Sequence, residues 1–126
     1  MFTIVTNSQL KLLRVKLKGF FTVEEVGAFA AAAQKAVADM GCSSGDWLHS
    51  CDIGEMALQT QQVAEMFGQF INHPERRSRK LAIITGRSPV RMQIRRLMTR
   101  QDAVLFDLQS DADAWLLGHA HHRLSA

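Results

Sequence analysis

The strongest candidate for chemistry is a short turn, rich in hydrogen-bonding groups, that follows a continuous apolar run. The apolar run is Leu81–Ile84, and the turn at residues 85–89 reads Thr-Gly-Arg-Ser-Pro. In open α/β sheets ligands gather at the carboxyl ends of strands, and the free N–H groups of a helix that begins there attract anions. Arg87 and Arg91 would add charge-assisted hydrogen bonds. The turn predicts either an anion site or a tight turn before a capped helix, since no phosphate-cradling G-x-x-x-x-G-K-[ST] sequence is present.

The turn lies inside a block of positive charge between Glu75 and Arg100. The block holds nine bases and one acid, a net charge of +8, whereas the rest of the chain holds six bases and eleven acids, a net charge of −5. Charge of this density must face water or an anionic partner. The bases of the block are Arg76, Arg77, Arg79, Lys80, Arg87, Arg91, Arg95, Arg96 and Arg100.

Residues 89–100 have the periodicity of an amphipathic helix with a basic outer face. At about 100° per residue the apolar side chains fall on one side, and the arginines form two flanking rows with Met92 pointing outward between them. Such a face would dock an acidic protein, an anionic small ligand or an anionic membrane surface, and a plain solvated helix face is the simpler alternative. The inner residues are Val90, Ile94, Leu97 and Met98, and the rows pair Arg91 with Arg95 and Arg96 with Arg100.

Nucleic acid is a poor match for this basic block. Residues 75–100 contain no aromatic side chain, and the whole chain contains no tyrosine. Proteins that bind single strands stack bases on aromatic side chains, and no helix-turn-helix spacing is visible. We therefore expect a protein or a small anion, rather than nucleic acid, as the partner.

A second group of reactive residues lies in the segment 49–55. His49 and Cys51 would share one face of a strand about 7 Å apart, which is too far for a direct hydrogen bond between nucleophile and base. Asp52 and Glu55 would be the candidate acid–base pair of a small hydrolase, which is the function that the sequence favours least.

The remaining titratable residues predict neither a metal site nor a cofactor. Three histidines near the C-terminus have no cysteine or carboxylate that completes a set of ligands, and the two cysteines lack the close spacing of a zinc or redox pair. We interpret Cys42 and Cys51 as reduced, mostly buried thiols, and with no secretory leader visible we expect a cytoplasmic protein. The tail 118–126 is expected to fray, and it holds His119, His121 and His122.

Hydrophobic periodicity and turn signals indicate the elements that must position these residues. The 126 residues suit a single domain covering 1–126. Strands alternate with helices after an initial strand pair, which predicts an α/β fold with a mostly parallel sheet. Thr22 and Glu25 are expected to cap the first helix, and Ser110 the last. The expected strands are 2–5, 13–18, 47–53, 81–84 and 103–106, and the expected longer helices are 23–40, 63–71 (ending before Pro74) and 89–100.

Three stretches of the sequence carry core and cap patterns that together resemble a known fold. They are residues 13–19 (LRVKLKG) leading into the helix capped by Thr22, residues 79–85 (RKLAIIT), and residues 104–106 (VLF) followed by 113–116 (DAWL). The chain resembles the STAS domain (sulfate transporter and anti-sigma-factor antagonist), in particular its SpoIIAA-like, or STAS/SEC14-like, bacterial branch. The resemblance implies a mostly parallel single sheet of about five strands with four helices, and a non-enzymatic regulatory or binding module.

The same resemblance bears on two further features. Anti-sigma-factor antagonists of this fold carry a phosphorylatable Ser or Thr directly after an Asp at the end of the third strand. Here Asp52 is followed by Ile53, so this site is not carried over, although Ser50 offers a hydroxyl nearby. The SEC14-like relation implies an alternative function, the binding of a small molecule or lipid in an apolar pocket between helices and sheet.

The sequence thus predicts a regulatory or binding module that docks an acidic protein or an anionic ligand. This docking surface requires that the basic side chains converge in space. The predicted contact residues are Thr85, Gly86, Arg87, Ser88, Arg91, Arg95 and Asp52.

Overall fold

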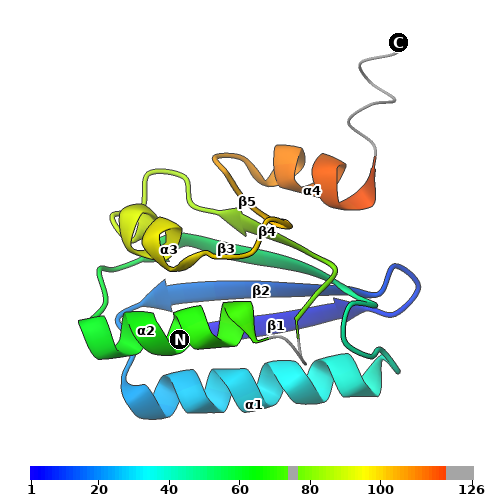
Figure 1. The fold of residues 1–126 in the computed structure, drawn as a ribbon, viewed down its shortest axis with the longest axis horizontal. Helices are drawn as coiled ribbons and strands as arrows, with labels where there is room; N and C mark the ends of the chain where they lie inside the picture. The colour runs from blue at the N-terminus through cyan, green and yellow to red at the C-terminus, as the bar shows by residue number, and fades with distance from the viewer. Residues whose placement is uncertain (74–76, 119–126) are drawn as a thin grey trace.

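The computed structural model describes residues 1–73 and 77–118. In this part of the chain, five strands and four helices follow one another in the predicted order, which confirms the α/β class (Figure 1). The strands are β1 (Phe2–Asn7), β2 (Leu12–Gly19), β3 (Leu48–Met56), β4 (Lys80–Ile84) and β5 (Ala103–Phe106), and the helices are α1 (Val23–Asp39), α2 (Gln61–Asn72), α3 (Arg91–Leu97) and α4 (Gln109–Leu117).

The five strands form one sheet in the order β1-β2-β3-β4-β5. β1 and β2 form the predicted antiparallel hairpin, and β2, β3, β4 and β5 run parallel to one another. The register places Cys51 of β3 opposite Val15 of β2 and Ile83 of β4. Because the parallel strands share one direction, the loops that follow them leave from the same edge of the sheet, which we call the carboxyl edge.

Helices cover both faces of the sheet. α1 and α2 lie on one face and α4 on the other, while α3 contacts α2 and buries Ile94 in the same core as α1 and α2 (Figure 1). β4 contributes to both cores, because Leu81 and Ile83 point toward α1 and α2 while Ala82 and Ile84 point toward α4. Burial on both faces confirms what the continuous apolar run predicts.

Two helices that leave the carboxyl edge begin with side-chain caps. At α1, Thr22 Oγ1 accepts a hydrogen bond from the Glu25 N–H and the Glu25 side chain accepts one from the Thr22 N–H, which confirms the predicted capping box. At α2, Thr60 Oγ1 accepts from the Val63 N–H at 3.2 Å. These caps fix where each helix begins relative to the strand before it.

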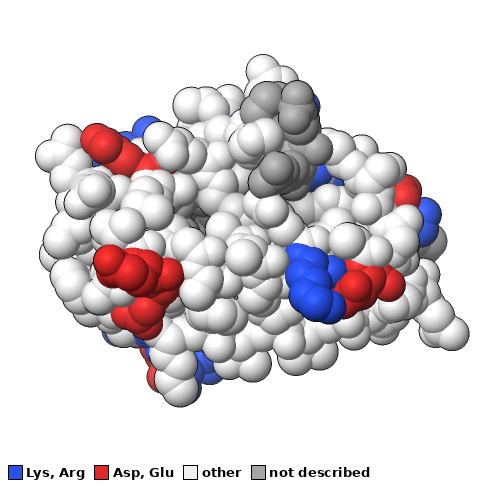
Figure 2. All heavy atoms as spheres, turned by 90° about the horizontal axis from the view of Figure 1, so that it is seen from below, with Lys and Arg blue, Asp and Glu red and all other residues white. Residues whose placement is uncertain are grey.

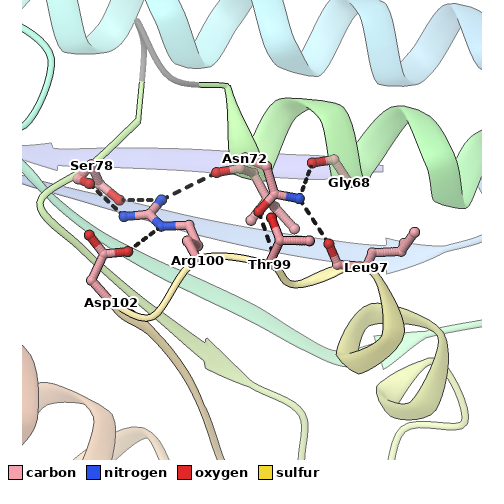
Figure 3. Close-up of polar contacts among 8 residues, drawn as sticks. Gly68, Asn72, Ser78, Leu97, Thr99, Arg100 and Asp102 are labelled. Carbon is pink, nitrogen blue, oxygen red and sulfur yellow. Dashed lines mark hydrogen bonds and ion pairs between the residues drawn. The ribbon is translucent and has the colours of Figure 1, made fainter.

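Helix α3 is shorter than the predicted helix 89–100. It begins at Arg91, after Ser88 and a turn, and ends at Leu97. Its end is bound by Asn72 of α2, whose Nδ2 donates to the Leu97 carbonyl at 2.8 Å and whose Oδ1 accepts from the Thr99 N–H at 3.3 Å (Figure 3). Because another helical turn would need these same backbone groups, the helix stops and its periodicity does not extend to residue 100.

Other predicted boundaries are also wrong, and the first strand, predicted to end at Val5, continues to Asn7. β3 continues through Gly54 to Met56 instead of ending at Ile53. Ser110 does not cap α4, because the helix begins at Gln109 and its capping position is Leu108, which makes no side-chain cap hydrogen bond. Some predictions fall outside the described residues, namely those on Pro74, Glu75, Arg76, His119, His121 and His122.

Candidate docking surface at the carboxyl edge

The loops after β2 and β3 are tied together by one buried glutamine. Gln59 Oε1 accepts from the Phe21 N–H at 2.9 Å. Gln59 Nε2 donates to the carbonyls of Gly19 at 3.0 Å and Ala57 at 2.6 Å. The side chain is only 6% exposed, so these bonds replace water contacts that the loop backbones would otherwise need. The two loops therefore form one rigid unit.

Helix α3 is bound to the same unit through Gln93. The Gln59 N–H donates to Gln93 Oε1, and Gln93 Nε2 donates to the Gln59 carbonyl, each at 2.9 Å. Gln93 thus brackets the backbone of Gln59 with both ends of its amide. Three segments that are distant in sequence meet at this pair.

Three large apolar side chains next in sequence to the residues of this glutamine network are exposed. Phe20 and Leu58 are each 56% exposed and Met92 is 54% exposed. Each is adjacent in sequence to a residue that the glutamine network binds, so the three backbones are held in fixed positions. We call these three residues the edge patch. Exposed apolar side chains on a rigid frame are typical of an interaction surface.

The predicted turn is attached to the end of β3, two residues before Leu58 of the edge patch. Ser88 Oγ donates to the Met56 carbonyl at 2.9 Å, which attaches the turn to the end of β3. Thr85 is fully buried, Gly86 adopts a positive φ of 51° that suits glycine, and Arg87 is exposed. The predicted site residues of this turn therefore lie together, with Arg87 as the one that faces solvent.

The other predicted site residues are placed differently. Arg91 Nη1 donates to Thr85 Oγ1 at 3.0 Å and to Asp107 Oδ1 at 2.6 Å, so its charge is already compensated. Arg95 is exposed on α3. Asp52 Oδ1 accepts from the Gly54 N–H at 2.9 Å, so the carboxylate helps to shape the end of β3.

Arg100 does not lie in an exposed row, so this prediction from the helical periodicity is wrong. The residue is only 9% exposed. Its guanidinium donates to the Ser78 carbonyl and Asp102 Oδ1, each at 2.5 Å, and to the Ile71 carbonyl at 3.3 Å (Figure 3). The hydrogen bond from Arg100 is the main reason that the pKa of Asp102 is lowered. Arg100 is therefore a structural residue that joins α2 to the start of β5.

The bases of the block that the structure describes do not converge on one surface. Arg77 and Arg79 are exposed but precede β4, at the end of the sheet opposite the carboxyl edge. Lys80 reaches to the other face, where its Nζ donates to the Trp115 carbonyl at 3.1 Å. The exposed bases that follow β4, and that form no ion pair within residues 1–73 and 77–118, are Arg87, Arg95 and Arg96.

The segment 49–55 does not form a catalytic arrangement. Burial lowers the pKa of His49 to about 3 and raises the pKa of Cys51 to about 12, so neither titrates near neutrality. Glu55 pairs with Lys16 at 2.8 Å rather than with Asp52. Ser50 is buried, and its hydroxyl accepts from Gln109 Nε2 at 3.1 Å.

In the described part of the chain no three His, Cys, Asp or Glu residues are grouped to hold a metal.

Comparison with known proteins identifies the fold. No protein-family model and no curated protein matches the sequence. A crystal structure of an uncharacterised DUF3478-family protein with a SpoIIAA-like fold, from Shewanella loihica PV-4, matches with a TM-score of 0.68 and 19% identity over 92% of each chain. An anti-sigma factor antagonist from Mycobacterium paratuberculosis matches with a TM-score of 0.62 and 12% identity over 92% of this chain and 94% of that chain. The chain thus has the SpoIIAA-like fold of STAS domains, as the sequence resemblance predicts.

Most of the edge patch is not predicted by the sequence patterns. The helical periodicity places Met92 outward, but it singles out neither Phe20 and Leu58 nor the glutamines that hold their loops. The sequence does carry one sign of an exposed aromatic residue. Phe20 and Phe21 follow Gly19, which ends the strand, and alternation leaves one of two adjacent aromatic residues outside the core.

Among the described helices, none is both long and apolar enough to cross a membrane.

Proposed function

We propose that this protein is a non-enzymatic regulatory module that binds a partner protein at the carboxyl edge of its sheet. The edge patch supplies the apolar contact, and Arg87 together with Arg95 pairs with acidic side chains of the partner. The fold is shared with an anti-sigma factor antagonist, and this likeness supports a regulatory, protein-binding class of function. The free thiols Cys42 and Cys51 favour action in a reducing compartment such as the cytoplasm.

The observation that carries this proposal is the edge patch and its rigid frame. Phe20, Leu58 and Met92 expose more than half of their surface although each neighbours a residue bound into the glutamine network. A loop backbone fixed in advance loses less conformational freedom on binding, so more of the apolar contact is realised as affinity. Aromatic and methionine side chains are also enriched where interfaces are buried.

Charge next to the edge patch indicates an acidic partner. Arg87 precedes Ser88, whose bond to the Met56 carbonyl attaches the turn to the end of β3 near Leu58, and Arg95 lies on the same helix as Met92. Arg91 is engaged by Asp107 and instead holds the turn in place. Arg87 and Arg95 form no ion pair within the described residues. Charged side chains of this kind beside exposed apolar ones match the usual anatomy of an interface, in which a polar rim surrounds an apolar centre.

A site-specific cross-linking experiment tests where the partner binds. A photoreactive phenylalanine at position 58, in the edge patch, should trap the partner in cells, and one at Ser8, in the hairpin turn at the opposite end of the sheet, should not (Figure 1). Mass spectrometry of the trapped peptide should show an acidic segment. Equal trapping from both positions would contradict docking at this edge.

Charge reversal then tests the electrostatic part with the trapped partner in purified form. Arg87→Glu should weaken binding about tenfold or more, and the loss should shrink as salt is raised. Arg79→Glu is the matched control, because Arg79 is equally exposed but precedes β4. Unchanged affinity for Arg87→Glu, or equal loss for both variants, would remove the acidic-partner proposal. Binding of anionic lipid vesicles in place of any protein would also contradict it.

A further inference from the structure

A shallow groove runs between α1 and α2 on the face opposite α4. It consists of two hollows of about 290 Å³ and 210 Å³, both lined in part by Gln34 and Phe70. No Lys, Arg, Asp or Glu among the described residues lines either hollow, and Figure 2 shows a broad white area of this face between the Asp and Glu cluster at one side and the charged pair at the other. The larger hollow is floored by Trp47 and Phe70. We call these two hollows the helical groove.

A buried histidine whose Nε2 atom has no hydrogen-bond partner among the described residues lies beneath the helical groove. His49 is 4% exposed, and within the described part of the chain its Nε2 atom has no partner. The imidazole stacks against Trp47 at 5.4 Å and meets Phe70 edge-on at 6.3 Å, centre to centre. These are the two aromatic residues that floor the larger hollow. A buried nitrogen left unpaired costs free energy, and a ligand that reached it would recover that energy.

His49 also lines a small cavity inside the core. The cavity holds about 20 Å³ and its other walls are almost entirely apolar, including Phe29, Ile83 and Phe70. One water would fit, but a buried water needs two to four polar partners and this cavity offers it chiefly one. An acyl chain would not fit in this cavity as it stands. Phe70, which is half-buried, lines both the inner cavity and the helical groove, and it separates the two.

We propose that the helical groove binds a neutral, apolar small molecule that carries one hydroxyl group. The apolar body lies on Trp47 and Phe70, and rotation of the Phe70 side chain opens the way for the hydroxyl to reach His49 Nε2. A hydroxyl both donates and accepts, so it pairs with either tautomer of the imidazole. No charged side chain of the described residues lines the groove to pair with a charged ligand, so the ligand is neutral. This site is separate from the edge patch and does not depend on partner docking.

Burial accounts for the state of the imidazole that such a ligand would meet. Desolvation, and secondarily the nearby Arg100, lower the pKa of His49 to about 3, so the ring is neutral at physiological pH. Cys51, the other titratable group of the inner cavity, is held as a neutral thiol because burial raises its pKa to about 12. The hydroxyl thus meets an uncharged ring and an uncharged thiol.

Two probes of nearly equal shape test the proposal. Para-cresol carries a hydroxyl where para-xylene carries a methyl, and each can be titrated into the intact protein by proton–nitrogen correlation NMR. We expect para-cresol to bind about tenfold more tightly and to shift the Nε2 resonance of His49, which para-xylene should leave in place. Equal affinities, no binding of either probe, or backbone shifts confined to the edge patch would overturn the proposal.

Variants locate the site independently. His49→Phe should abolish the preference for para-cresol, and a preference that survives it would overturn the proposal; if this variant does not fold, the Nε2 shift of the unmodified protein decides. Ala38→Phe fills the larger hollow from an exposed helix position and should block both probes. Ala31→Phe is the matched control on the same helix, since Ala31 is exposed but lines neither hollow. Equal binding to the two phenylalanine variants would place the ligand elsewhere.

Discussion

The side-chain amide of Gln93 brackets the backbone of Gln59, accepting from its N–H and donating to its carbonyl at 2.9 Å each. The Gln59 side chain in turn binds Phe21 and Gly19 of the neighbouring loop. Helix α3 and the loops after β2 and β3 are therefore joined by bonds between residues far apart in sequence. The arrangement gives the edge patch a fixed shape.

Replacing Gln93 with alanine should loosen this arrangement. Two partly buried backbone groups of Gln59 lose their partners, so we expect the free energy of unfolding to fall by about 1–2 kcal/mol. Partner affinity should fall with it, because the edge patch is no longer held. Urea denaturation measures the stability change. Gln69→Ala on α2 is the control, since Gln69 is exposed and its side chain makes no hydrogen bond in the described part of the chain. Equal stability of the two variants would show that the bracket contributes nothing.

Arg100 should be among the most sensitive positions in the chain. Its removal leaves the carbonyls of Ser78 and Ile71 without their donor and leaves Asp102 without its partner. We expect Arg100→Ala to lower the free energy of unfolding by about 3 kcal/mol. Arg100→Lys should restore little of this stability, because an ammonium group lacks the planar, forked donors with which a guanidinium reaches these acceptors together.

Chemical denaturation of three variants separates this role from a simple loss of charge. Arg96→Ala removes an exposed arginine from α3 and should change stability by no more than about 0.5 kcal/mol. Similar stabilities for Arg100→Ala and Arg96→Ala would mean that the buried guanidinium is dispensable. Full recovery of stability in Arg100→Lys would mean that charge alone is sufficient.

The parts of the fold that sequence predicts well are those whose causes are local. Thr22 and Glu25 are three residues apart, and their capping box needs nothing from the rest of the chain. The run Leu81–Ile84 has no polar face to expose, so burial on both sides follows from composition. The alternation of strands and helices then restricts the topology to a mostly parallel sheet.

The parts that sequence predicts poorly depend on contacts from elsewhere in the chain. A helical wheel places Arg100 at the surface only while the helix continues, and Asn72 ends it at Leu97 from 25 residues away. The basic residues are close together in the sequence, which suggests a single charged surface. In the structure β4 lies between Arg79 and Arg87 and places them at opposite ends of the sheet. The edge patch depends in the same way on loops that meet only after folding.

Acid should destabilise the fold partly through His49. Its pKa is about 3 in the folded protein, chiefly because burial disfavours the charged ring, against an ordinary value of 6.5. As pH falls below 6.5 the unfolded chain binds a proton that the folded protein does not, so stability is lost over the window from 6.5 down to about 3. The loss from this residue should reach about 3 kcal/mol near pH 4.

Comparison with His49→Gln isolates this contribution, since glutamine does not titrate. Urea denaturation of both proteins at neutral pH and near pH 4 should show the unmodified protein losing more stability on acidification than the variant. The lowered pKa values of Glu25, Glu55 and Asp102 also cost stability in acid, but they are common to both proteins and cancel in the difference. A difference between the proteins that does not change with pH would contradict the assignment.

The two thiols should react at very different rates. Cys42 is partly exposed at the end of α1, whereas Cys51 is buried in β3, where burial and then Asp52 raise its pKa to about 12. Thiolate is the reactive form, so the folded protein should take one iodoacetamide label, on Cys42, and a second only on unfolding. Cys42→Ser should take none until it unfolds, and mass spectrometry counts the labels. Labelling of Cys51 in the folded protein as fast as Cys42 would contradict its burial.

The rate at which Cys51 becomes labelled then measures how often the core opens. Reaction at a buried thiol requires an opening that exposes it, so the rate follows the free energy of that opening. If the Gln59–Gln93 bracket stabilises the core as well as the edge patch, Gln93→Ala should speed the labelling of Cys51 in Cys42→Ser protein, and Gln69→Ala should not. If both leave the rate unchanged, the bracket holds only the carboxyl-edge loops, and the core opens independently of the surface that we propose for docking.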